Sequence, residues 1–234
     1  MKRIQLSSNE LKIIAVIAMV FDHFVGGFVS ADSTFGLLLR CPGRIAAPIM
    51  CYLISEGYFH TKNLNKYISR LFIFSLISHV PYNLYFNLGF FQATSVMWSL
   101  CLGLIALASV NNEEIPILFK ICIVGVCCLL AVRANWNYIA VLWIVFFGIF
   151  RGDRKKQFIA FTLIALIEII PIYIGIGPVK ESYPHFYRFG IFLALLIIRL
   201  YNGEKGKGGK NLSRLFYIVY PLHLLLLYII RIII

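Results

Sequence analysis

The sequence predicts an all-α fold: a polytopic, integral membrane helical bundle formed by one domain over residues 1–234. Of the 234 residues, 60% are apolar and 14% are charged, whereas a soluble domain has about 25% charged residues. The mean hydropathy is +0.84. The apolar residues form continuous runs, unlike the alternating pattern of a transmembrane β-barrel. These observations exclude a soluble enzyme and a disordered chain.

The apolar runs give the expected helices in order. A helix needs about 20 apolar residues to cross the hydrocarbon core. By that measure the chain has about nine transmembrane helices, near residues 11–30, 43–59, 67–88, 94–110, 115–132, 136–150, 156–177, 186–201 and 212–231. The first run resembles a signal peptide, but it contains Asp22 and His23, which a removable segment does not need. We therefore expect a retained first helix.

Basic residues between the apolar runs predict the orientation. The net charge is +12, and Lys and Arg accumulate in cytoplasmic loops, which favours a topological role over nucleic-acid binding. With the N-terminus inside, the cytoplasmic segments contain Lys2, Arg3, Lys62, Lys66, Arg151, Arg154, Lys155, Lys156, Lys205, Lys207 and Lys210. The opposite loops contain Arg40, Arg44, Arg133, Lys180 and Arg188. This asymmetry predicts an N-in, C-out topology. The lysines of residues 203–210 also suit anionic lipid or a nucleotide phosphate.

Ionisable residues inside the predicted helices are the candidate functional groups, because they are costly in lipid. They are Asp22, His23, Glu56, His79, Glu168 and His223. For each, the alternative is a polar side chain that faces the bundle interior and is satisfied by a hydrogen bond. The six cysteines show no metal-ligand spacing, so no metal site is expected.

His23 lies eleven residues after Lys12, and eleven steps of about 100° return to nearly the same helix face. At about 1.5 Å per residue, the two are separated by roughly 16 Å along the axis. This geometry suits a long ligand with an anionic head outside and a reactive end within, as in coenzyme A. A core histidine and an interfacial lysine are the alternative.

The second predicted helix carries two pairs with a spacing of four residues. Arg40 and Arg44 can present two guanidinium groups to an anion, or can extend to the membrane interface. Asp22 is expected either to orient another group or to pair with Arg44. Glu56 and His60 form a plausible hydrogen-bonded pair near the cytoplasmic side.

Two prolines lie beside polar residues in later helices. His79 and Asn83 flank Pro81, and His223 follows Pro221. Proline frees a backbone carbonyl and kinks the helix, which usually marks a cavity. We therefore place His79, Asn83 and His223 among the candidate substrate-binding residues.

Several stretches together resemble a known family. They are residues 11–15, 21–23, 43–48, 56–58, 60–61, 70–71, Ser78, Pro81, Tyr82, 98–100, 102–104 and 220–224. They resemble the TraX family of membrane proteins, named for the conjugative pilin N-acetylase, over most of the chain. That family is similar to the wider transmembrane acyltransferases, whose hallmark is a basic residue, ten intervening positions and a histidine in the first helix. Here Lys12 and His23 fit the pattern, with lysine where arginine is common. Lysine offers a phosphate group a point charge rather than the bidentate guanidinium of arginine.

The resemblance implies a bacterial plasma membrane acetyltransferase that uses cytoplasmic acetyl-CoA as co-substrate. The expected acceptor is an amine, such as a peptide N-terminus, at or across the membrane. The candidate catalytic residues are His23, as general base or acetyl carrier, Asp22 and Glu56. The candidate acetyl-CoA-binding residues are Lys12, Arg44 and Arg40.

Other functions stay open at this point. The acceptor class extends to small molecules, glycans and peptides, and O-acetylation of a glycan or lipid headgroup competes with N-acetylation. Intramembrane Asp and His also suit an ion-coupled transporter, although no internal repeat is visible. A membrane assembly factor is a further alternative, and it predicts that substitution of His23 is tolerated.

Overall fold

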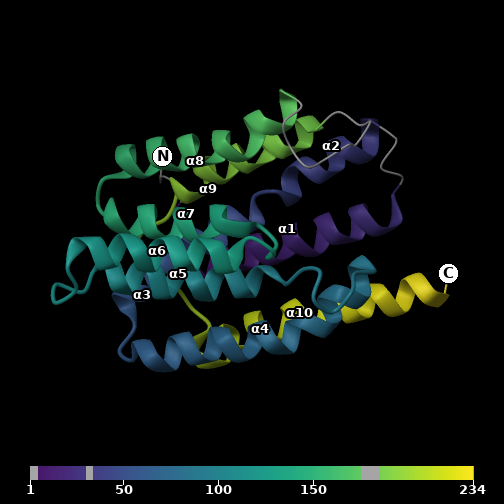
Figure 1. Ribbon diagram of the computed structural model, residues 1–234. Helices are drawn as coiled ribbons and strands as arrows, with labels where there is room; N and C mark the ends of the chain where they lie inside the picture. The colour runs from purple at the N-terminus through teal and green to yellow at the C-terminus, as the bar shows by residue number, and fades with distance from the viewer. Residues whose placement is uncertain (1–4, 30–33, 175–184, 234) are drawn as a thin grey trace.

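The computed structural model describes residues 5–29, 34–174 and 185–233, and these ranges consist of helices connected by loops and turns (Figure 1). The helices are α1 (Ser8–Phe28), α2 (Thr34–Gly43), α3 (Ala46–His60), α4 (Leu64–Phe86), α5 (Val96–Val110), α6 (Ile117–Ala131), α7 (Asn137–Ile149), α8 (Arg154–Tyr173), the 3-10 helix η1 (His185–Phe192), α9 (Leu193–Ile198) and α10 (Gly209–Ile233). Within the described ranges the only β-type pairings are two isolated bridges. The predicted all-α class is confirmed.

Local sequence explains where several helices begin and end. Ser7 and Glu10 form a capping box at the start of α1. The side chains of Asn63 and Asp153 each accept a hydrogen bond from the backbone N–H three residues later, at the starts of α4 and α8. Such caps satisfy amide groups that have no partner within the helix. Asn87 ends α4 in the left-handed conformation with φ 53°, which asparagine tolerates better than most residues.

The helices form a bundle around α5 and α7. Helices α5, α6 and α7 pack against one another, α4 pairs with α10 along one side, and α8 lies along the other side (Figure 1). Glycines allow the close contact of α5 with α7, because a Cβ at Gly103 would overlap Ile144 and one at Gly148 would overlap Leu107. Helix α1 contacts α2, α3 and α10. Two of its polar residues, Asn9 and Asp22, are buried in the bundle, whereas Glu10 is exposed.

Among the residues that the structure describes, four helical segments are long and apolar enough to cross a membrane: Ser8–Phe28, Thr34–His60, Arg154–Tyr173 and Leu215–Ile233. Helices α5, α6 and α7 have 13–15 residues, fewer than the roughly 20 that a perpendicular crossing requires. A helix overlaps each of the nine predicted runs. The chain is thus a helical membrane protein, while the count of nine crossings stays a prediction.

The second predicted helix, 43–59, needs correction. Thr34–His60 is one candidate span, interrupted where α2 ends at Gly43 and α3 begins at Ala46. Arg40, which lies before the predicted start at residue 43, is part of α2, and Arg44 lies at the break between α2 and α3. The hydropathy of the sequence did not predict the first half of this helix, because it contains charged residues. Hydropathy cannot show that Arg40 and Arg44 both pair with a carboxylate within the bundle.

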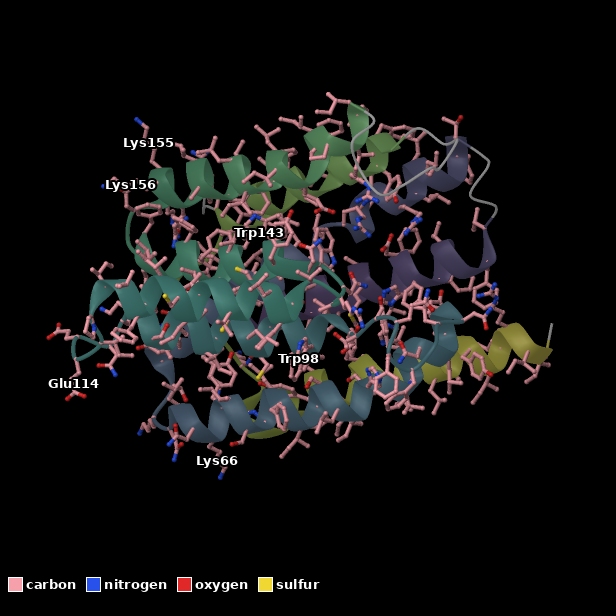
Figure 2. The ribbon with its side chains drawn as sticks, viewed as in Figure 1. Lys66, Trp98, Glu114, Trp143, Lys155 and Lys156 are labelled. Atoms are coloured by element: carbon pink, nitrogen blue, oxygen red, sulfur yellow. The ribbon has the colours of Figure 1, made fainter. Side chains whose placement is uncertain are left out.

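Charged residues of the predicted cytoplasmic loops lie at one end of the bundle. Figure 2 shows Lys66, Glu114, Lys155 and Lys156 there, although they come from loops far apart in the sequence. At the other end, the segments that follow α4 and α6 are joined by hydrogen bonds from Thr94 N to Arg133 O and from Asn135 N to Thr94 O, both 2.9 Å. The clustering agrees with the alternation expected from the sequence, and the N-in orientation itself stays a prediction.

Candidate functional site

Two adjoining hollows lie between α1, α3, α5 and α10. The inner cavity, of about 70 Å³, is lined by Asp22, His23, Arg44, Trp136 and Tyr220 among others. The outer pocket, of about 460 Å³, is lined by residues that include Lys12, Glu56, His60, Arg70 and Lys205. Met50, Met97, Leu100 and Phe216 line both. The two hollows therefore share an apolar wall.

Helix α1 contributes to both hollows through one face. Lys12 lines the outer pocket and His23 lines the inner cavity. This arrangement confirms that the two residues share a helix face, about three turns apart. The ammonium group of Lys12 lies 5.8 Å from the ring centroid of Phe216 on α10, which places Lys12 beside the wall common to both hollows.

His23 forms a direct hydrogen bond with His223 of α10. Nδ1 of His23 lies 2.7 Å from Nε2 of His223, and Nδ1 of His223 lies 2.9 Å from the carbonyl oxygen of Val219. Tyr85 of α4 donates its hydroxyl proton to the carbonyl oxygen of His23. The histidine expected at the centre of the chemistry is thus held by two other helices. His223, expected among the substrate-binding residues, contacts His23.

Asp22 pairs with both arginines of the broken helix. Its carboxylate accepts from Nη1 of Arg44 at 3.2 Å and from Nε of Arg40 at 3.3 Å. Of the two alternatives left open for Asp22, the structure shows the pairing with Arg44. The guanidinium of Arg44 also lies 4.5 Å from the ring centroid of Trp136, and its Nε is buried without a hydrogen-bond partner. Arg44 therefore has a free donor at the inner cavity, while Arg40 lines neither hollow.

Glu56 lies in the outer pocket rather than beside His23. Its carboxylate accepts from Nε and Nη2 of Arg151, at 3.0 and 3.3 Å. Nε2 of His60 lies 3.6 Å from Glu56 Oε2, so the two side chains are neighbours as predicted but are too far apart for the expected hydrogen bond. Because Arg151 binds both carboxylate oxygens, this ion pair connects α3 to the loop before α8.

His79 and Asn83 bind the backbone of the segment that follows α4. Nε2 of His79 lies 2.7 Å from the carbonyl oxygen of Phe90, and Nδ2 of Asn83 lies 3.3 Å from the same oxygen. Neither residue lines the inner cavity or the outer pocket. Their observed contacts hold a turn in place.

Sequence reasoning missed two residues of this site as binding candidates. Arg70 on α4 lines the outer pocket, and its guanidinium lies 5.0 Å from the ring centroid of Tyr217. A basic residue inside the predicted run 67–88 was the signal that could have identified it. Trp136 lines the inner cavity with φ 62°, a backbone conformation that no composition or spacing rule predicts. Across the described residues, no group of three or more His, Cys, Asp or Glu is arranged to hold a metal ion.

Comparisons with known proteins agree with the resemblance. The family model described as TraX protein matches residues 7–231. A protein of Dichelobacter nodosus, named as a probable fimbrial assembly protein FimC of serogroup H1, is 32% identical over 97% of this chain and 96% of its own length. No solved structure matches the chain. The chain therefore belongs to the TraX family.

Proposed function

We propose that this protein is a membrane acetyltransferase that binds acetyl-CoA in the outer pocket and presents the thioester to His23 in the inner cavity. One observation carries the proposal: a cationic pocket adjoins a smaller cavity that contains a histidine, and both are lined by one face of α1. A long ligand with an anionic head and an acyl end has this shape.

Three basic side chains support binding of the anionic end. Lys12, Arg70 and Lys205 line the outer pocket. The carboxylate there, Glu56, is already bound by Arg151. The pocket therefore carries uncompensated positive charge, which phosphate groups require. On the predicted orientation this pocket opens to the cytoplasm, where acetyl-CoA is available.

The chemistry follows from an unprotonated nitrogen of His23. As general base, His23 takes a proton from the acceptor amine while the amine nitrogen bonds to the acetyl carbonyl carbon. The C–S bond breaks, and the imidazolium returns the proton to the coenzyme A thiolate. As nucleophile, His23 would first take the acetyl group and then pass it to the amine. In both routes Arg44 is placed to stabilise the developing oxyanion, since its Nε has no partner.

The acceptor we favour is an amine on a peptide. The relative in Dichelobacter nodosus is named for fimbrial assembly, and a subunit N-terminus supplies such an amine. A hydroxyl of a glycan or lipid headgroup is the competing acceptor, because the same base serves both nucleophiles.

The test is transfer of radiolabelled acetyl groups from acetyl-CoA in membranes that contain the wild-type protein or His23→Gln. The acceptors are short peptides with free or blocked N-termini, and hydroxyl-bearing glycans. Label on the free-amine peptide that disappears in His23→Gln supports the proposal. Equal labelling in both membranes rejects His23 chemistry.

A membrane assembly factor is the second candidate, favoured by the name of the same relative. In that role the protein would act through helix contacts and would not need an acyl donor. Fimbrial assembly that survives His23→Gln, with no binding of acetyl-CoA, would establish this alternative over the enzyme.

A further inference from the structure

We propose that His223 is a positioning residue that fixes which nitrogen of His23 reacts. It holds His23 as the tautomer with the proton on Nδ1, so that Nε2 is the basic atom at the inner cavity. The catalytic consequence rests on the proposed acetyltransferase function, whereas the tautomer itself follows from the contacts of two residues.

The argument begins at the backbone of α10. A carbonyl oxygen only accepts hydrogen bonds, so Nδ1 of His223 carries the proton that it donates to Val219 O at 2.9 Å. In a neutral imidazole the other nitrogen is then an acceptor. Nε2 of His223 therefore presents a lone pair to His23. The carbonyl group of Val219 thus sets the tautomer of His223, and His223 in turn sets the tautomer of His23.

The ring geometry makes this an in-plane hydrogen bond rather than a stacking contact. The two imidazole planes are within 4° of parallel, and their centroids are 5.0 Å apart. The two facing nitrogens are 2.7 Å apart. Adding the distance from each ring centroid to its nitrogen gives the observed centroid separation only if both centroids and both nitrogens lie on one line. The two rings therefore lie edge to edge in a common plane. The N–H bond of His23 then points along the lone pair of His223, the direction in which a hydrogen bond is strongest.

The reactive nitrogen of His23 is therefore Nε2. No residue that the structure describes forms a hydrogen bond with it, and His23 lines the inner cavity. His223 is absent from the lining of that cavity as described. His223 thus acts on a bound thioester only through His23.

The proton balance of the reaction uses this arrangement. When the amine nitrogen bonds to the acetyl carbon and the C–S bond breaks, Nε2 of His23 takes the amine proton. The resulting imidazolium keeps its Nδ1–H on His223, which stabilises the positive charge by a charge-assisted hydrogen bond. Nε2 then delivers its proton to the thiolate. The opposite tautomer would present an N–H to the acceptor and could take no proton.

The tautomer is measured directly by nitrogen NMR of the full-length protein in detergent, labelled with 15N-histidine. The chain has five histidines, and His23→Gln identifies the His23 signals by their disappearance. We expect a protonated Nδ1 and an unprotonated Nε2 for His23. A protonated Nε2 in the wild-type protein would overturn the proposal, whether or not acetyl transfer is ever detected.

Two matched substitutions test the effect on rate. In His223→Gln the side-chain amide reaches the position of Nε2 and can accept from His23, whereas in His223→Asn it reaches only the position of Nδ1. Both variants are first checked for a monodisperse elution profile in detergent. We expect His223→Asn to lower kcat about 100-fold with little change in KM for acetyl-CoA. We expect His223→Gln to stay within about tenfold of wild type. Equal kcat values for the two variants would show that His223 has only a structural role.

Discussion

Oδ2 of Asp22 lies 3.2 Å from Nη1 of Arg44, and the same carboxylate accepts from Arg40 at 3.3 Å. The first helix and the broken second helix are joined by this contact. Two cations on one buried anion leave a local net charge of +1 beside His23. The pairing also explains why Arg40 and Arg44 lie inside the bundle rather than in a loop.

Removing the shared anion should destabilise the protein. Asp22→Asn leaves two guanidinium groups without a counter-charge inside the bundle. Breaking a fully buried ion pair typically costs about 3–5 kcal/mol, and the cost here should be smaller because both arginines are partly exposed. We expect a clearly lower unfolding midpoint in detergent. Asp153→Asn is the matched control, because Asp153 is partly exposed and asparagine also caps helices well. Equal midpoints for the two variants would contradict the structural role of Asp22.

The break in the second helix brings Gly43 against α1. A Cβ at this position would overlap Cβ of Asp22. Gly43→Ala should therefore push the two helices apart and cost about 1–3 kcal/mol, as overpacking usually does. Gly125→Ala is the control, since nothing lies within 4 Å of a Cβ there. The comparison is made by thermal unfolding, and a stable Gly43→Ala protein would argue against this contact.

Basic residues of the outer pocket should act on donor binding. Lys12→Glu is expected to raise the KM for acetyl-CoA about tenfold or more, because a charge-assisted contact is lost and a repulsive one gained. The kcat should change little. Lys66→Glu provides the control at the same end of the bundle (Figure 2), as Lys66 is exposed and lies outside the pocket lining. A KM that responds equally to both substitutions would indicate general surface charge rather than a binding site.

Glu56 was expected among the catalytic residues, and its position in the outer pocket leads to a different prediction. Glu56→Gln removes a negative charge and frees Arg151, so KM for acetyl-CoA should fall while kcat is preserved. Steady-state kinetics at several acetyl-CoA concentrations separate the two constants. A kcat that drops about 100-fold would restore Glu56 as a participant in proton transfer.

The sequence predicted those features that depend on local spacing. Helix positions followed from apolar runs, and the common face of Lys12 and His23 followed from helix periodicity. The proximity of Glu56 and His60 followed from a separation of four residues. In each case the geometry of a single helix is sufficient.

Contacts between distant segments were beyond such reasoning. His23 and His223 are 200 residues apart, and Glu56 and Arg151 are 95 apart. Only the packing of α1 against α10, and of α3 against the end of α7, brings these pairs together. The positions of Arg40 and Arg44 were mispredicted for the same reason, because a hydropathy scale counts each charge separately and takes no account of an ion-pair partner. Their neutralisation by Asp22 is a tertiary property.

The central claim is that His23 acts on a bound acetyl thioester. The most direct test measures acetyl-CoA binding to the purified protein in detergent, together with slow loss of the thioester, for wild type beside His23→Ala. The account predicts that both proteins bind acetyl-CoA and that only the wild type consumes the thioester, alone or with an added amine. A folded wild-type protein that does not bind acetyl-CoA, or thioester loss that persists in His23→Ala, would contradict it.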